Sequence, residues 1–220
     1  MTDRVACTAF LLSTLLVAPF LRAPASAGPA EPLPEPVTAE EYAVFNRVVD
    51  GKFLTSQTEI VFIGPLTVTH LGPGEQDRPS TAYFRERQVF AGLLEPALVT
   101  DFILKNSKPG RLEKKFNFGI RYRFIPGDGD GTREPEVSLA PIPAAWRPAE
   151  GARLVQEAPR LIGILRFSRV GFTSHADKAL VYVEEERANG TGVGFLILLA
   201  RQKQGWNFLD TEVLWVTHPE

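Results

Sequence analysis

The chain has 220 residues, with 24 Lys and Arg against 26 Asp and Glu, a formal net charge of −2 and one cysteine. This balance of charge, without a basic stripe, argues against nucleic acid as a partner. A single cysteine excludes an internal disulfide and a zinc site built on several thiolates.

The first 27 residues have the pattern of a cleavable signal peptide. Arg4 precedes an apolar run from Ala9 to Leu21. This run is too short for a transmembrane helix, which needs about 20 residues. Ala25-Ser26-Ala27 then supplies the small residues that a signal peptidase requires. We therefore expect an exported protein, periplasmic or secreted, that begins at Gly28 and has no membrane span after cleavage. An uncleaved anchor is the alternative interpretation.

Removal of residues 1–27 also removes Cys7, so the mature chain contains no cysteine. Residues 28–37 contain four prolines in ten positions, which favours an extended linker ahead of a single domain at 38–220. Thr38 and Glu41 have the spacing of a capping box, and the apolar residues after them predict a helix from Thr38 to Val49.

The middle of the chain predicts two strands and a second helix. Glu59 to His70 is rich in β-branched residues and is interrupted at Gly64-Pro65, as in an edge strand or a bulge. A helix is expected from about Leu94 to Lys105, with a proline in its first turn. Lys115 to Phe124 alternates between apolar and polar residues, which indicates a half-buried antiparallel strand. Residues 126–148 form a surface segment rich in Gly, Pro and Asp, and residues 81–92 have no clear pattern.

Four apolar runs with short links predict a meander at the C-terminal end. They extend from Leu161 to Phe172, Ala179 to Glu185, Val193 to Gln202 and Trp206 to Thr217. The fold class is therefore α+β, with N-terminal helices packed on a curved antiparallel sheet that ends in a four-strand meander. The last two strands are apolar on both faces, and we expect the helices to cover only one face. The segment 126–148 would cover the other as a lid, or a second copy would do so in a homodimer.

The C-terminal meander resembles a group of uncharacterised exported bacterial proteins. The resemblance rests on Ser168-Arg169-Val170-Gly171-Phe172, Ala179-Leu180-Val181-Tyr182-Val183, Gly192-Val193-Gly194, Gly205-Trp206 and Leu214-Trp215-Val216. It implies export and carries no activity with it. The order of helices and strands is also similar, more distantly, to the cone-shaped fold of nuclear transport factor two and ketosteroid isomerase, and this likeness rests on layout alone.

Several motifs that resemble catalytic, metal or phosphate sites have simpler structural explanations. Ser174, His175 and Asp177 are the residue types of a hydrolase triad, but near neighbours in a tight turn do not converge. Residues 128–131 alternate Asp and Gly, yet Arg133 and Leu139 occupy the positions where a calcium loop needs Gly and Glu. Gly192-Val193-Gly194 indicates a close approach of the backbone or a bulge, and both Trp206 and Trp215 are expected in the core without a role in stacking on a ligand.

Arginines provide the only candidate binding residues. Arg121 and Arg123 share the polar face of one predicted strand, and Arg166 and Arg169 belong to another, so together they could bind an anion. A solvated, charged face is the alternative. We predict no catalytic residue, no metal site and no cofactor. The expected function is a non-catalytic binding or interaction module of the cell envelope, whose partner is a small molecule or an envelope protein. The alternative is a small-molecule enzyme of the cone-fold type with an acid or base in its pocket.

Overall fold

Residues 33–73, 77–125, 163–187 and 190–217 are described by a computed structural model of the chain. The described residues from Pro34 onward form one compact unit, and all statements below concern that unit. The predicted signal peptide, residues 28–32 of the predicted linker, the Asp-Gly motif at 128–131 and the proposed lid at 126–148 lie outside the described residues.

The N-terminal helices begin where local signals place them. Helix α1 spans Ala39–Val48 and continues into a π-helical turn, η1, at Val49–Phe53. Its capping box is present: the Thr38 side chain accepts from the Glu41 N–H, and the Glu41 carboxylate accepts from the Thr38 N–H at 2.9 Å. Helix α3, Pro96–Lys105, starts with proline in its first turn, where the missing N–H is not needed. The predicted capping box and proline start are thus confirmed.

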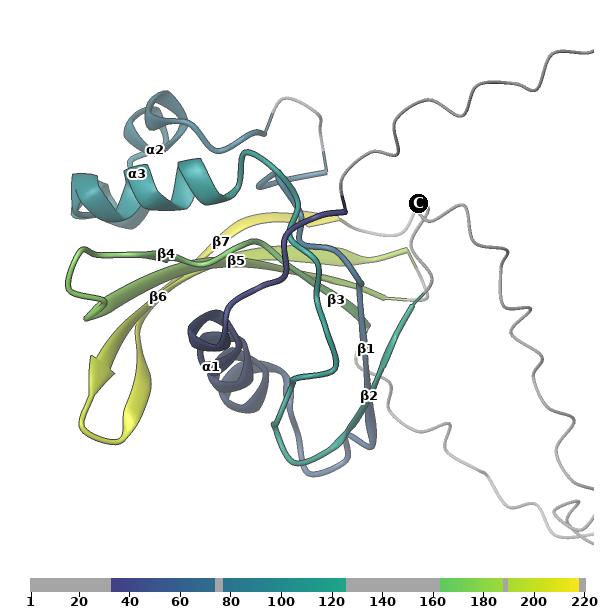
Figure 1. Cartoon of the computed structure of the whole chain (residues 1–220). Helices are drawn as coiled ribbons and strands as arrows, with labels where there is room; N and C mark the ends of the chain where they lie inside the picture. Colours follow the sequence, from purple (N-terminus) through teal and green to yellow (C-terminus); the bar gives the residue numbers. More distant parts are fainter. Residues whose placement is uncertain (1–32, 74–76, 126–162, 188–189, 218–220) are drawn as a thin grey trace, which may run out of the picture. The chain divides into compact units, whose positions relative to one another are not determined.

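The stretch without a clear sequence pattern also forms short helices. Helix α2 spans Thr81–Glu86, and its first turn is capped by the Ser80 hydroxyl, which accepts from the Tyr83 N–H. A 3-10 turn, η2, follows at Val89–Gly92. Both precede α3 on the same side of the sheet (Figure 1).

A mixed sheet of seven strands forms the centre of the described unit (Figure 1). Its strands are β1 (Ile60–Ile63), β2 (Arg121–Phe124), β3 (Ile164–Phe167), β4 (Gly171–Phe172), β5 (Lys178–Glu186), β6 (Gly192–Gln202) and β7 (Gly205–Thr217). Their order is β2-β1-β3-β5-β6-β7, with β4 paired to β5. Strands β3 to β7 pair antiparallel, which confirms the C-terminal meander and the α+β class. The single run predicted at Leu161–Phe172 is divided into β3 and β4.

The expectation of an antiparallel strand over Lys115–Phe124 is wrong in length and direction. Only Arg121–Phe124 is strand, and it runs parallel to β1, which also runs parallel to β3. Phe116 and Phe118 are buried in the aromatic core ahead of the strand. Alternation reports that one side of a segment is buried, and it carries no information about the direction of the partner strand. The strand expected at Glu59–His70 is regular only over β1, and beyond Gly64-Pro65 the chain pairs through isolated bridges at Leu66 and Val68.

Helices cover both faces of the sheet, and the expectation that they cover only one is wrong. Helix α1 lies on one face, and helices α2 and α3 lie on the other (Figure 1). Beneath α1 is a core that includes Phe45, Phe167 and Trp206. Beneath α3 is a second core that includes Phe102 and Tyr182. One helical layer on each side therefore accounts for the apolar residues on both faces of β6, whereas Leu209, Val213 and Val216 of β7 stay exposed.

Candidate binding pocket

The described residues include a pocket of about 220 Å³ on the face of the sheet that carries α2 and α3. Tyr182 belongs to the core beneath α3, and Glu184 and Glu186 follow it on the same face of β5 because side chains alternate along a strand. The lining residues are His70, Pro73, Arg166, Glu184, Glu186, Gly190, Thr191, Gly192, Trp215 and Thr217.

Strand register assembles the pocket from four strands. Arg166 of β3 lies opposite Glu184 of β5, Glu184 lies opposite Gly194 of β6, and Gly194 lies opposite Trp215 of β7. These residues form one row across the sheet. The next row places Glu186 opposite Gly192, and Gly192 opposite Thr217.

Two glycines of β6 make room for the indole of Trp215. A Cβ atom on Gly194 would lie 2.2 Å from Trp215 Nε1, and one on Gly192 would lie 3.0 Å from Trp215 Cζ3. The ring therefore lies against the bare backbone of β6, and the ladder shifts register between Gly194 and Phe195. Of the two alternatives expected for Gly192-Val193-Gly194, the close approach of the backbone is confirmed, and the extra residue of the register shift is Leu214 of β7.

A chain of hydrogen bonds connects Trp215 to the carboxylate of Glu184. Trp215 Nε1 donates to the Tyr182 hydroxyl at 2.7 Å, and that hydroxyl donates to Glu184 Oε2 at 3.1 Å. Burial, together with the nearby Glu184 carboxylate, raises the pKa of Tyr182 far above its ordinary value. The hydroxyl therefore stays protonated and holds one oxygen of Glu184 in place.

Two carboxylates share one guanidinium at the pocket. Arg166 Nη1 lies 3.5 Å from Glu184 Oε1 and donates to Glu186 Oε2 at 2.6 Å. The side chain of Glu184 is 10% exposed, whereas that of Glu186 is 54% exposed. With a neutral histidine, the charged residues of the lining leave one excess negative charge.

His70 contributes an imidazole nitrogen that has no hydrogen-bond partner among the described residues. Its Nδ1 atom is buried and lies 3.9 Å from Glu184 Oε2, which is beyond hydrogen-bond distance. Buried polar atoms in proteins are nearly always paired, so an unpaired nitrogen in a pocket wall is a feature that needs an explanation.

The structure separates the four arginines that the sequence grouped. Arg121 and Arg123 are exposed on β2, two strands away from β3, while Arg166 belongs to the pocket. Arg169 pairs instead with Glu41, through Nε at 2.7 Å and Nη2 at 3.0 Å. An anion at Arg169 would have to compete with this buried carboxylate. Anion binding by Arg121 and Arg123 stays a prediction.

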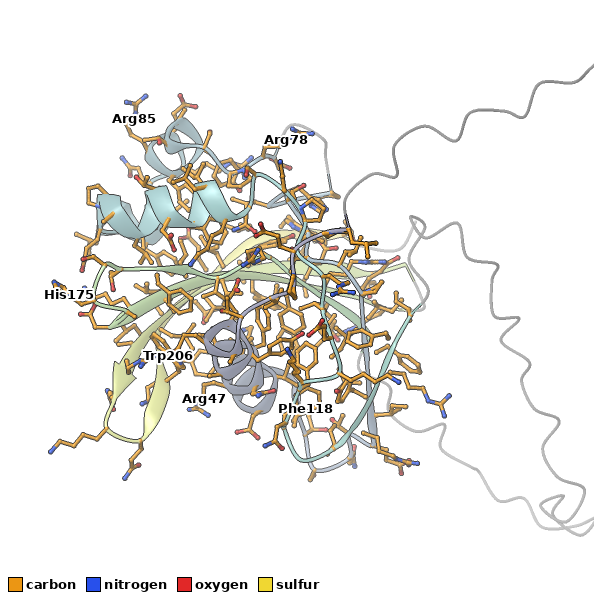
Figure 2. The ribbon with its side chains drawn as sticks, viewed as in Figure 1. Arg47, Arg78, Arg85, Phe118, His175 and Trp206 are labelled. Carbon is orange, nitrogen blue, oxygen red and sulfur yellow. The ribbon has the colours of Figure 1, made fainter. Side chains whose placement is uncertain are left out.

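The serine, histidine and tryptophans discussed in the sequence analysis lie in a turn and against the two cores. Ser174 and His175 are exposed in the turn between β4 and β5, at the end of the hairpin (Figure 2). Trp206 is 6% exposed and packs beside α1, where its Nε1 donates to Glu40, as expected of a core residue. Trp215 packs against the second core, as expected, but it is only partly buried and also lines the pocket.

Sequence reasoning missed His70, Glu184 and Glu186 as site residues. His70 stands alone in the sequence, and only the fold brings it to the meander. The two glutamates had a usable signal, because they follow Tyr182 at alternate positions and so share its face of the strand. Their pairing with Arg166 depends on register, which the sequence does not specify.

Comparisons with known proteins add no family to these observations. No protein-family model matches the chain, and no curated protein or solved structure matches it significantly. Among the described residues, no group of three or more His, Cys, Asp or Glu side chains could hold a metal ion. None of the helices in the described ranges is long and apolar enough to cross a membrane.

Proposed function

We propose that this chain is an exported binding module of the cell envelope that holds a small molecule, without catalysis, in the pocket between His70 and Trp215. Export is supported by the apolar run and small-residue site of the first 27 residues. The observation that carries the binding proposal is the pocket itself, where an indole seated on two glycines meets a fixed carboxylate. An apolar wall with a few oriented polar groups is the usual composition of a ligand site.

A fragment screen by protein NMR on residues 28–220 tests this proposal. Hits should shift the Trp215 indole resonance together with the amides of Gly192 and Glu186. In a Thr217→Trp variant with an unchanged melting temperature, the added ring should fill the pocket and abolish those shifts. Hits scattered over the surface, or hits that persist unchanged in the filled variant, would contradict the proposal.

A small-molecule enzyme is a second candidate, and the proximity of His70 to Glu184 favours it. An imidazole beside a carboxylate is a common acid–base pair. Binding is the better-supported function because Tyr182 and Arg166 already engage both oxygens of Glu184. Turnover of any pocket-bound compound that is lost in His70→Ala, while binding is retained, would favour the enzyme instead.

A further inference from the structure

We propose that the ligand of this pocket is a small organic molecule that carries a primary ammonium group. The inference rests on the proposed function and specifies its chemistry. The ammonium group would lie among Glu184, Glu186 and His70, with the carbon part of the molecule against Trp215.

The hydrogen bonds within the pocket wall favour a ligand that donates hydrogen bonds. Three hydrogen-bond donors of this wall bond acceptors of the same wall: Trp215 Nε1 bonds the Tyr182 hydroxyl, the Tyr182 hydroxyl bonds Glu184, and Arg166 Nη1 bonds both glutamates. Acceptor capacity remains in excess, because each carboxylate offers about four lone-pair sites. A primary ammonium group has three donors and no acceptor, which complements such a wall.

The unpaired nitrogen of His70 fits the same ligand. Nδ1 of a neutral imidazole is an acceptor when the proton is on Nε2, and none of the described residues donates to it. An ammonium bound at Glu184 Oε2 would lie close to this nitrogen, because the two protein atoms are 3.9 Å apart. Since Nδ1 is buried in the structure, contact with both atoms requires the imidazole to turn toward the pocket. One ligand group would then satisfy the buried atom and the carboxylate together.

Charge favours a cation over an anion. The two carboxylates outnumber the single guanidinium, and Arg166 is already held between them. An anion would have to draw Arg166 away from Glu184 and Glu186 and would meet uncompensated negative charge. A cation meets only an attractive field, which is stronger at Glu184 because that side chain is nearly buried.

Trp215 and the pocket volume limit the rest of the ligand. Indole is the aromatic group that attracts cations best, and it also provides apolar contact area. A volume of about 220 Å³ is below the 300 to 1,000 Å³ of ordinary ligand pockets. The ligand is therefore smaller than a typical cofactor or nucleotide.

Three probes of similar size and different charge test the inference. Phenethylamine, 2-phenylethanol and phenylacetate are titrated into residues 28–220 by calorimetry, with the Trp215 indole resonance as a second readout. The amine should bind about tenfold more tightly than the alcohol, the size of gain expected for a partly desolvated cation with aromatic and carboxylate partners. Phenylacetate should bind more weakly than the alcohol.

A matched pair of variants tests whether the affinity for the amine depends on the negative charge of the pocket. Glu186→Gln removes one half-exposed pocket carboxylate and should weaken phenethylamine binding about tenfold, a larger loss than for the uncharged 2-phenylethanol. Glu95→Gln is the control: Glu95 is 48% exposed and pairs with Lys178 outside the pocket, as Glu186 pairs with Arg166 inside it. The control should bind all three probes as the unsubstituted chain does.

The outcomes separate this inference from the proposed function. If the alcohol or phenylacetate binds at Trp215 as tightly as the amine, or if Glu186→Gln leaves amine affinity unchanged, the ammonium inference is overturned and the binding function stands. If none of the three probes shifts Trp215 and the fragment screen also gives no hits in the pocket, both proposals are overturned.

Discussion

Glu41 is an acidic side chain with 1% exposure that nevertheless has a lowered pKa. Burial alone would raise the pKa, but hydrogen bonds from Arg169, Thr38 and the Val170 N–H outweigh it. The backbone of Arg169 also forms two hydrogen bonds with the side chain of Asn106, at the end of α3: its carbonyl accepts one and its N–H donates the other. One ion pair therefore joins the start of α1 to the link between β3 and β4, which is tied in turn to α3.

Removing Arg169 should strongly destabilise the protein, because an unpaired buried carboxylate remains. We expect Arg169→Met to lower the free energy of unfolding by about 3 to 5 kcal/mol. Urea denaturation followed by circular dichroism measures it. The double variant Arg169→Met with Glu41→Gln should regain part of the lost free energy of unfolding, since it also removes the unpaired carboxylate charge. A double variant that is as unstable as the sum of the two single variants would contradict this account.

The stability contribution of Glu41 should depend on acid pH. A lowered folded-state pKa means that the contribution is fully present above the ordinary value of 4.5 and is lost as pH falls through the folded value. The free energy of unfolding should therefore decline below about pH 4.5, and the Glu41→Gln variant should decline less steeply. Urea titrations at a series of pH values compare the two slopes, and equal slopes would assign acid sensitivity to other groups.

Ser174 and His175 should be replaceable without consequence. Both side chains are exposed in the turn before β5, and the neighbouring Asp177 carboxylate bonds Thr173 instead of the histidine. Ser174→Ala and His175→Ala should each change the free energy of unfolding by less than about 0.5 kcal/mol and leave binding of pocket probes unchanged. Thermal melts and the probe titrations check this. Loss of an assayable activity in either variant would restore a catalytic interpretation of the turn.

At the scale of elements, α3 and β4 are in backbone contact through Gly171. A Cβ atom there would lie 2.6 Å from Phe102 Cβ and 2.7 Å from Phe102 Cα, so backbone would have to move. The neighbouring N–H of Phe172 donates to Asp101 of the same helix at 2.7 Å. The glycine therefore fixes the distance between α3 and the sheet.

Gly171→Ala should separate α3 from β4 and lower the free energy of unfolding by about 3 kcal/mol, the upper end of overpacking costs. Gly64→Ala is the control, because its nearest contact is the side chain of Arg166 at 3.1 Å, which can move. The control should cost less than about 1 kcal/mol. Differential scanning calorimetry of both variants measures the contrast, and similar melting temperatures would refute the contact argument.

Elements with local signals could be predicted, and pairings between distant segments could not. The capping box at Thr38, the proline at the start of α3 and the short links of the meander act within a few residues, so the sequence contains them. The parallel pairing of β1 with β2 and β3 joins segments about 60 and 100 residues apart, and local periodicity is the same for either direction.

The pocket could be predicted from the sequence only in part, for the same physical reason. Gly192 and Gly194 indicated a close approach within the meander, and this was confirmed. Which group approaches depends on the register of β6 with β7, and the contribution of His70 depends on the path of the chain after β1. The positions of the arginines could not be predicted for a similar reason, since Arg169 pairs with Glu41, which lies 128 residues earlier.

For the whole molecule, the N-terminal region predicts that the mature protein starts at Gly28. Cleavage after Ala27 follows from the small residues at Ala25 and Ala27 behind a short apolar run. N-terminal sequencing of the protein purified from the cell envelope measures the start. An intact Met1 in envelope material would show that the segment remains as an anchor.

The bulges of β6 and β7 have a consequence for solubility. Strand β7 is the terminal strand of the sheet order and has 13 residues, with Leu209, Val213 and Val216 exposed. A long, flat edge of this kind is a template for aggregation. Two register shifts, at Gly194/Phe195 and Leu198/Leu199, increase the local twist of the β6–β7 pair, so β7 does not present a straight ladder. The register shift beside the glycine that seats the pocket indole is therefore expected to disfavour edge-to-edge pairing of neighbouring molecules.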